Sequence, residues 1–192
     1  MARIDQETRS GAGPGAIAFG AIVLGAVVSL LLGFYGREHE PTGETIVTFG
    51  FGGLAAMKVY LSVIVGVLAL VQVFTALWMY GRLGLGVPSW LGVAHKLSGA
   101  AAILVSLPVA YHCLWSLGFQ TTDTRVAVHS VAGCVVYGAL VAKLVGLHAR
   151  RAPGWLLPAA ACLLLASIVA VIWTGAVWYV GEFGWPDTST GY

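Results

Sequence analysis

The chain has 192 residues, of which 58% are hydrophobic and only 9% are charged, and its mean hydropathy is +0.87. Soluble domains carry about 25% charged residues, so this composition excludes an ordinary soluble protein and predicts a single transmembrane domain over residues 1–192. The net charge of +2, without any basic run interleaved with aromatic residues, argues against a partner nucleic acid.

Five apolar stretches are long enough to cross a hydrocarbon core, which takes about 20 helical residues. They predict an all-α integral membrane bundle with helices near 16–35, 53–80, 92–117, 126–148 and 155–180. The first stretch is too long for the core of a cleaved signal peptide, so we expect a retained helix. The connectors are short and hold glycine, proline or charged residues, so chemistry in water would need a separate protein chain.

A row of small side chains follows one face of the first predicted helix. Ala21, Gly25, Ser29 and Gly33 recur every four residues. Such a row lets two membrane helices approach closely without a hydrophobic driving force. It predicts a packing face and implies no chemistry.

Lysine and arginine are unequally shared between the two sides of the predicted bundle. With the N-terminus inside, three of them lie outside, namely Arg37, Lys58 and Arg125. Seven lie on the cytoplasmic side: Arg3, Arg9, Arg82, Lys96, Lys143, Arg150 and Arg151. Because positive charge is retained in the cytoplasm, the N-terminus is predicted inside and the C-terminus outside.

Four of the five histidines lie near the ends of the third and fourth predicted helices. His95 and His112 are separated by 17 positions, and His129 and His148 by 19, or roughly 25 to 29 Å along a helix. Because consecutive helices run antiparallel, His112 is expected level with His129 outside, and His95 level with His148 inside. Along each helix the direction in which the side chain points changes by about 100° between the two histidines, and the two changes have opposite senses. On facing antiparallel helices, this turns both histidines of a pair toward the same side of the helix pair. The sequence therefore predicts two pairs of iron ligands, one for an outer haem and one for an inner haem.

Glycines and cations near these histidines fit the same prediction. The spacing H-x-x-x-G occurs at His95 with Gly99 and at His129 with Gly133, and a glycine one turn away leaves room for a porphyrin. Haem propionates favour nearby cations, and the candidates are Arg125 and Lys58 outside and Lys96, Arg82 and Lys143 inside. The alternative for each cation is a side chain that reaches toward lipid headgroups.

The remaining histidine and the cysteines are not expected to bind a cofactor. His39 lies in the charged segment Arg37–Glu40 and is predicted to be solvated. Cys113, Cys134 and Cys162 fall inside apolar stretches without C-x-x-C spacing, and are predicted to be small core residues.

The stretch from His95 to His148 resembles the membrane b-type cytochromes of bacteria, in which transmembrane helices hold two haems through paired histidines. The resemblance rests on Pro108-Val-Ala-Tyr-His112 and Asp123-Thr-Arg125-Val-Ala-Val-His129. It implies two haem b groups and a multi-pass place in the bacterial plasma membrane. The chain also resembles small bacterial membrane proteins labelled only as a domain of unknown function, which imply no activity. Quinol-oxidising cytochrome b subunits space their histidines about one helical turn closer, so no quinone site is carried over.

An iron with two histidine ligands has no open position, so it passes electrons and does not bind substrate. The expected function is a non-catalytic electron-transfer subunit of an oxidoreductase of the respiratory chain. Its expected partners are membrane lipid, a redox protein with an iron–sulfur, flavin or cytochrome group, and a quinol. Two alternatives remain: a haem-free membrane subunit, and a membrane protein that handles copper or zinc through the same histidines.

Overall fold

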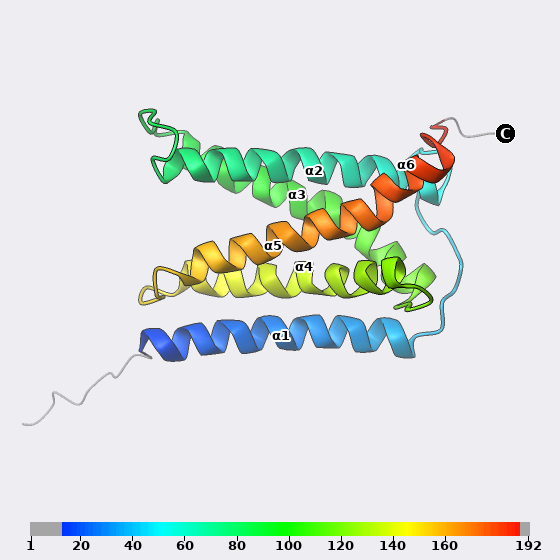
Figure 1. Cartoon of the computed structure of the whole chain (residues 1–192), viewed down its shortest axis with the longest axis horizontal. Helices are drawn as coiled ribbons and strands as arrows, with labels where there is room; N and C mark the ends of the chain where they lie inside the picture. Colours follow the sequence, from blue (N-terminus) through cyan, green and yellow to red (C-terminus); the bar gives the residue numbers. More distant parts are fainter. Residues whose placement is uncertain (1–12, 189–192) are drawn as a thin grey trace, which may run out of the picture.

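The computed structural model describes residues 13–188. All the secondary-structure elements in this region are helices, and it contains no strand. Its long helices are α1 (Pro14–Glu38), α2 (Leu54–Met79), α3 (Leu91–His112), α4 (Thr124–His148) and α5 (Leu156–Ile172) (Figure 1). Two π-helical segments extend them: η1 (Cys113–Leu117) follows α3, and η2 (Trp173–Val177) joins α5 to the short α6 (Trp178–Phe183).

The described region contains five helical spans long and apolar enough to cross a membrane. The predicted all-α bundle of five such helices is therefore confirmed. The predicted boundaries lie close to the observed ones, and the largest differences are at the C-terminal ends of the first and last spans, which run on to Glu38 and Phe183. The inside–outside orientation stays a prediction, and two residues used for it, Arg3 and Arg9, lie outside the described residues.

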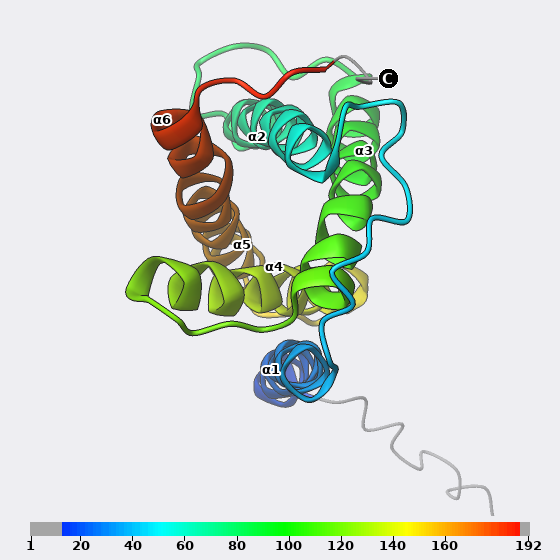
Figure 2. The ribbon, with the colours of Figure 1, turned by 90° about the vertical axis from the view of Figure 1, so that its right-hand side faces the viewer.

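Four of the helices stand in a ring, and α1 lies outside it (Figure 2). In this ring α4 packs along α5 and α2 packs along α3, whereas α2 meets α5 over a shorter stretch. α1 packs along the outer side of α4. Although α3 and α4 are consecutive, they make no extensive contact with each other. A hydrogen bond of 3.0 Å between the hydroxyls of Ser106 on α3 and Tyr137 on α4 joins them.

The contact between α1 and α4 is made by glycines. A Cβ added at Gly25 would lie 2.6 Å from the carbonyl oxygen of Gly138, and one added at Gly138 would collide with Ser29 Oγ. Ala21 and Gly25 are buried, and the Ser29 hydroxyl donates to the Gly25 carbonyl at 3.1 Å. The prediction that the small-residue row is a packing face is confirmed.

The N-terminus of α4 is capped by Asp123, whose Oδ1 accepts a hydrogen bond from the Val126 amide at 2.9 Å. Replacing Asp123 with alanine should lower the free energy of unfolding by about 0.5–2 kcal/mol, because one helix-end amide loses its partner. Unfolding of the detergent-solubilised protein, followed by circular dichroism, measures the loss. Asp123→Ser keeps a capping oxygen, so its free energy of unfolding should stay near that of the wild type. Equal losses of unfolding free energy in both variants would show that the cap does not contribute.

Candidate functional site

An apolar cavity of about 600 Å³ lies between α2, α3, α4 and α5, at the end of the bundle where α3 ends and α4 begins. Most of its lining is aliphatic, but Lys58, Arg125, His129 and Thr174 also border it. Its volume lies within the range of roughly 300–1,000 Å³ typical of pockets for cofactors and small ligands. A few polar groups around an apolar space are what a buried amphipathic ligand requires.

His129 is fixed at the cavity by α5 and η2. Its Nδ1 lies 3.1 Å from the Thr174 hydroxyl, which already donates its one hydrogen to the Ala170 carbonyl at 2.6 Å. The imidazole must therefore donate from Nδ1, which leaves the lone pair of Nε2 free. Gly175 allows this close approach, because an added Cβ there would be 2.9 Å from His129 Cε1.

Both π-helical segments border the cavity. η2 presents Thr174 and Gly175 to His129, and η1 begins at Cys113, five residues after Pro108, which cannot donate a backbone hydrogen bond. Segments of this kind inside membrane and soluble helices are frequent at functional sites. Both irregular helix ends thus converge on the same space.

Two cations at the cavity were predicted to serve the outer haem, and the structure places both there. Arg125 Nη1 donates to the Thr174 carbonyl at 2.9 Å, and its guanidinium lies 3.6 Å above the Trp178 ring. The same side chain is 3.9 Å from the Asp123 carboxylate. Arg125 is therefore held at the cavity edge, where a cation–π contact and two polar partners fix its position.

Cys113 borders the cavity, as do His129 and Lys58. The prediction that all three cysteines are core residues holds for Cys134, which is 7% exposed. It is wrong for Cys162, which is exposed on the outside of the bundle, whereas Cys113 is half-buried and, like Cys134, borders the cavity. Helix periodicity alone did not distinguish a core position from a cavity position.

His112 lies at the same end of the bundle but not in the lining of this cavity. Its ring is 2% exposed, its Nδ1 lies 2.8 Å from the Pro108 carbonyl, and its buried Nε2 has no hydrogen-bond partner in the described part of the chain. Ser116, one turn further on the same face, donates to the Glu44 carbonyl at 2.6 Å. This face of α3 is therefore turned toward the connector between α1 and α2.

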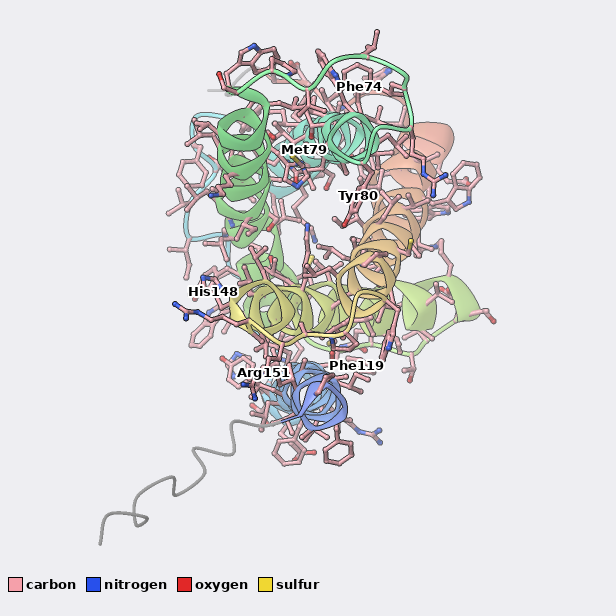
Figure 3. All side chains as sticks on the ribbon, turned by 90° about the vertical axis from the view of Figure 1, so that its left-hand side faces the viewer. Phe74, Met79, Tyr80, Phe119, His148 and Arg151 are labelled. Carbon is pink, nitrogen blue, oxygen red and sulfur yellow. The ribbon has the colours of Figure 1, made fainter. Side chains whose placement is uncertain are left out.

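The inner pair of predicted ligands lies at the opposite end. His95 Nδ1 is 2.7 Å from the Thr75 hydroxyl, which donates to the Val71 carbonyl at 2.7 Å. His148 is exposed, and its Nδ1 lies 2.8 Å from the Leu144 carbonyl. Figure 3 shows His148 at the outer edge of the bundle, beside the end of α4.

The cations predicted for the inner haem differ in their surroundings. Lys96 is exposed. Lys143, from α4, lies close enough to His95 to interact with it electrostatically.

The two glycines expected to make room for a porphyrin have different neighbours. Gly133 borders the cavity, and a Cβ added there would meet nothing within 4 Å. A Cβ added at Gly99 would lie 3.1 Å from Gln72 Oε1, and the Gln72 amide donates to the His95 carbonyl at 2.6 Å. Gly133 thus faces open space, whereas the missing side chain at Gly99 makes room for Gln72 of α2.

His39 is not solvated as predicted. Its ring stacks on Tyr35 with centroids 5.2 Å apart and lies tilted by 31° against Trp115 with centroids 4.5 Å apart, and its Nε2 is buried. The charged neighbours in the sequence concealed this aromatic contact with the end of α3. His39 is nevertheless not part of the cavity lining.

The structure thus brings His129, Arg125, Lys58 and Gly133 to one cavity, and leaves His95, Lys96, Gly99 and His148 at the other end. Sequence reasoning missed Thr75 and Thr174, whose hydroxyls orient two of the histidines. A hydroxyl inside an otherwise apolar span was the available indication. Within residues 13–188 there is no group of three or more His, Cys, Asp or Glu side chains arranged to hold a metal ion.

Comparison with known proteins gives a family and no activity. No curated protein matches the chain, and no solved structure matches it. A family model described as a family of unknown function, DUF6529, matches residues 18–187, a range that includes the cavity and all four predicted histidine ligands. The protein therefore belongs to the DUF6529 family.

Proposed function

We propose that this protein is a membrane b-type cytochrome, whose haems carry electrons between the two sides of a bilayer. The observation that carries the proposal is the state of the four histidines on α3 and α4. In each of them Nδ1 has a hydrogen-bond partner, which for the histidines in chain order is Thr75, Pro108, Thr174 and Leu144. Carbonyl oxygens can only accept, and both threonine hydroxyls already donate elsewhere, so every Nδ1 carries hydrogen. Every Nε2 then keeps a lone pair, as an iron-ligating histidine requires.

The cavity supports a haem at the outer end. His129 would supply an axial nitrogen there, and the open face of Gly133 would lie against the macrocycle. Lys58 and Arg125 would hold the propionates, because both border the same cavity and carry positive charge. The haem, when bound, supplies a one-electron couple between ferric and ferrous iron.

At the inner end His95 and His148 would hold the second haem. Thr75 orients the His95 ring in the same way as Thr174 orients the His129 ring. The same kind of contact, between a threonine hydroxyl and an imidazole, therefore occurs at both ends of the bundle. Lys96 and Lys143 are the cations near this end. Two haems at opposite ends would give electrons a route through a layer that excludes charge.

We place the protein in the bacterial plasma membrane as an electron-transfer subunit of a respiratory oxidoreductase complex. Its partners would be lipid, a quinol, and a separate redox protein with an iron–sulfur, flavin or cytochrome group. The support is that the connectors between the helices, such as 39–53, are too short to hold such a group.

An absorption spectrum of the purified protein tests the proposal. The full chain is solubilised in detergent and measured oxidised and then reduced with dithionite, with haem and iron counted per polypeptide. Sharp reduced bands of a b-type cytochrome with two haems per chain are expected. A folded protein without haem would refute the proposal, and stoichiometric copper or zinc would favour the metal-handling alternative.

Replacing Thr174 with valine should weaken retention of the outer haem by about 10–100-fold, because His129 loses the group that orients its ring. The measurement is haem loss on dilution into apomyoglobin, which captures released haem. Ser167→Ala is the matched control: Ser167 is also buried in α5 but donates only to the Leu163 carbonyl of its own helix. Equal haem loss in the two variants would show that the contact with His129 does not matter.

A further inference from the structure

The end of α3 turns one face toward the cavity, and His112 is not on that face. Val109, Ala110 and Cys113 border the cavity, whereas His112 does not. Because successive residues of a helix are turned by about 100°, the side chains of His112 and Cys113 leave α3 in clearly different directions. Among the residues that the structure describes, His129 on α4 is the only histidine in the cavity lining, and no methionine lies there.

Hydrogen bonds to the connector before α2 hold the end of α3 in this rotation. The Ser116 hydroxyl donates to the Glu44 carbonyl at 2.6 Å, and the Gly43 amide donates to the Ser116 carbonyl at 3.0 Å. The His112 ring is 2% exposed, and its Nδ1 donates to the Pro108 carbonyl at 2.8 Å. To bring His112 to the cavity, α3 would have to rotate about its axis and break the contacts with the connector.

We infer that the chain supplies one axial ligand to the outer haem, His129, and leaves the opposite position of the iron open to a neutral diatomic gas. This inference rests on the proposed haem function and replaces the second ligand that the sequence predicted, His112. Globins and peroxidases hold their haem through a single histidine, and the polarity of the pocket on the other side of the haem decides what binds there. When the gas binds, it donates an electron pair to ferrous iron; no bond breaks, and no electron is transferred.

The walls of the cavity favour a small neutral ligand. Most of the lining is aliphatic, so an ion entering this space would lose its hydration without compensation. Ser106 donates its one hydrogen to the Ile103 carbonyl at 2.8 Å, so the Tyr137 hydroxyl, 3.0 Å away, donates to Ser106. Both hydroxyl hydrogens of this pair are therefore engaged within the protein. This part of the lining favours gases that need no hydrogen-bond donor, such as CO and NO.

Carbon monoxide is the probe that tests the inference. The full-length protein in detergent is reduced with dithionite, and its absorption spectrum is recorded before and after CO is added, with bound CO and haem counted per chain. We expect CO to bind one of the two haems. The ferric protein should give one high-spin signal in electron paramagnetic resonance beside one low-spin signal of a bis-imidazole haem.

Three variants locate the gas site. His129→Ala should abolish CO binding, because the outer haem loses its one protein ligand. His112→Ala and Cys113→Ser are the controls at the end of α3. Both should keep one CO per chain, since neither side chain occupies the open position.

A wild-type protein with two haems, neither of which binds CO, would overturn the inference and leave the proposed function standing. CO binding that appears only in His112→Ala, or only in Cys113→Ser, would overturn it too and identify that residue as the second ligand. One CO per chain in a His129→Ala protein that retains one haem would overturn it by placing the gas at the inner haem. A wild-type protein that binds no haem would overturn both proposals. The wild-type spectra give a result even if a variant fails to fold.

Discussion

Replacing His129 with alanine should halve the haem content, from two haems to one per chain, and remove the outer haem only. His129 is the one predicted ligand that borders the cavity, and its ring is oriented there by Thr174. Under the proposed function, His129→Ala would remove the α4 residue that holds the outer haem, while the proposed inner ligands His95 and His148 lie at the opposite end. Haem is counted per polypeptide, and the ferric spectrum identifies which haem remains.

His39→Ala is the control for this loss, because His39 lies outside the cavity and packs on Trp115 and Tyr35. It should keep both haems. Equal loss of both haems in His129→Ala, with the helical content intact, would argue against two independent sites. Full retention of both would exclude His129 as a ligand.

A methyl group added at Gly25 should destabilise the bundle by about 1–3 kcal/mol, the usual cost of overpacking a close contact. The new Cβ would lie 2.6 Å from the Gly138 carbonyl oxygen, a backbone atom that cannot turn aside as a side chain would. α1 and α4 must therefore separate. Thermal unfolding of the protein in detergent measures the loss for Gly25→Ala.

Gly20→Ala is the matched control on the same helix. Gly20 is exposed, and a Cβ there would meet nothing within 4 Å. The substitution should be neutral or stabilise by up to about 1 kcal/mol, because alanine favours a helix over glycine. If both variants unfold at the same temperature, the close approach of Gly25 and Gly138 does not hold α1 in place.

The five spans were predictable because their lengths and apolar content are set by the thickness of the bilayer. The α1 packing face was predictable for a similar reason, since the row from Ala21 to Gly33 repeats at the helical period. The change to π-helical geometry at η2, inside the last span, was not predictable. It depends on Thr174 and Gly175 meeting His129, a contact between residues 45 positions apart.

At the site, sequence reasoning correctly grouped Lys58, Arg125 and Gly133 with His129, because their depth in the bundle follows from position along each helix. It could not establish which face of α3 turns inward near Pro108, where the helix changes to a π-helical segment. A rotation of one residue separates His112 from Cys113. That rotation is set by packing against the connector at Glu44, which no local pattern encodes.

The position of α1 outside the ring has a consequence for synthesis. As the chain leaves the ribosome, α1 enters the membrane first, but its docking partner α4 begins only at Thr124, after two further helices have been made. During that interval the glycine face of α1 must lie against lipid or an insertion factor. Docking of α1 therefore waits until α4 has been made.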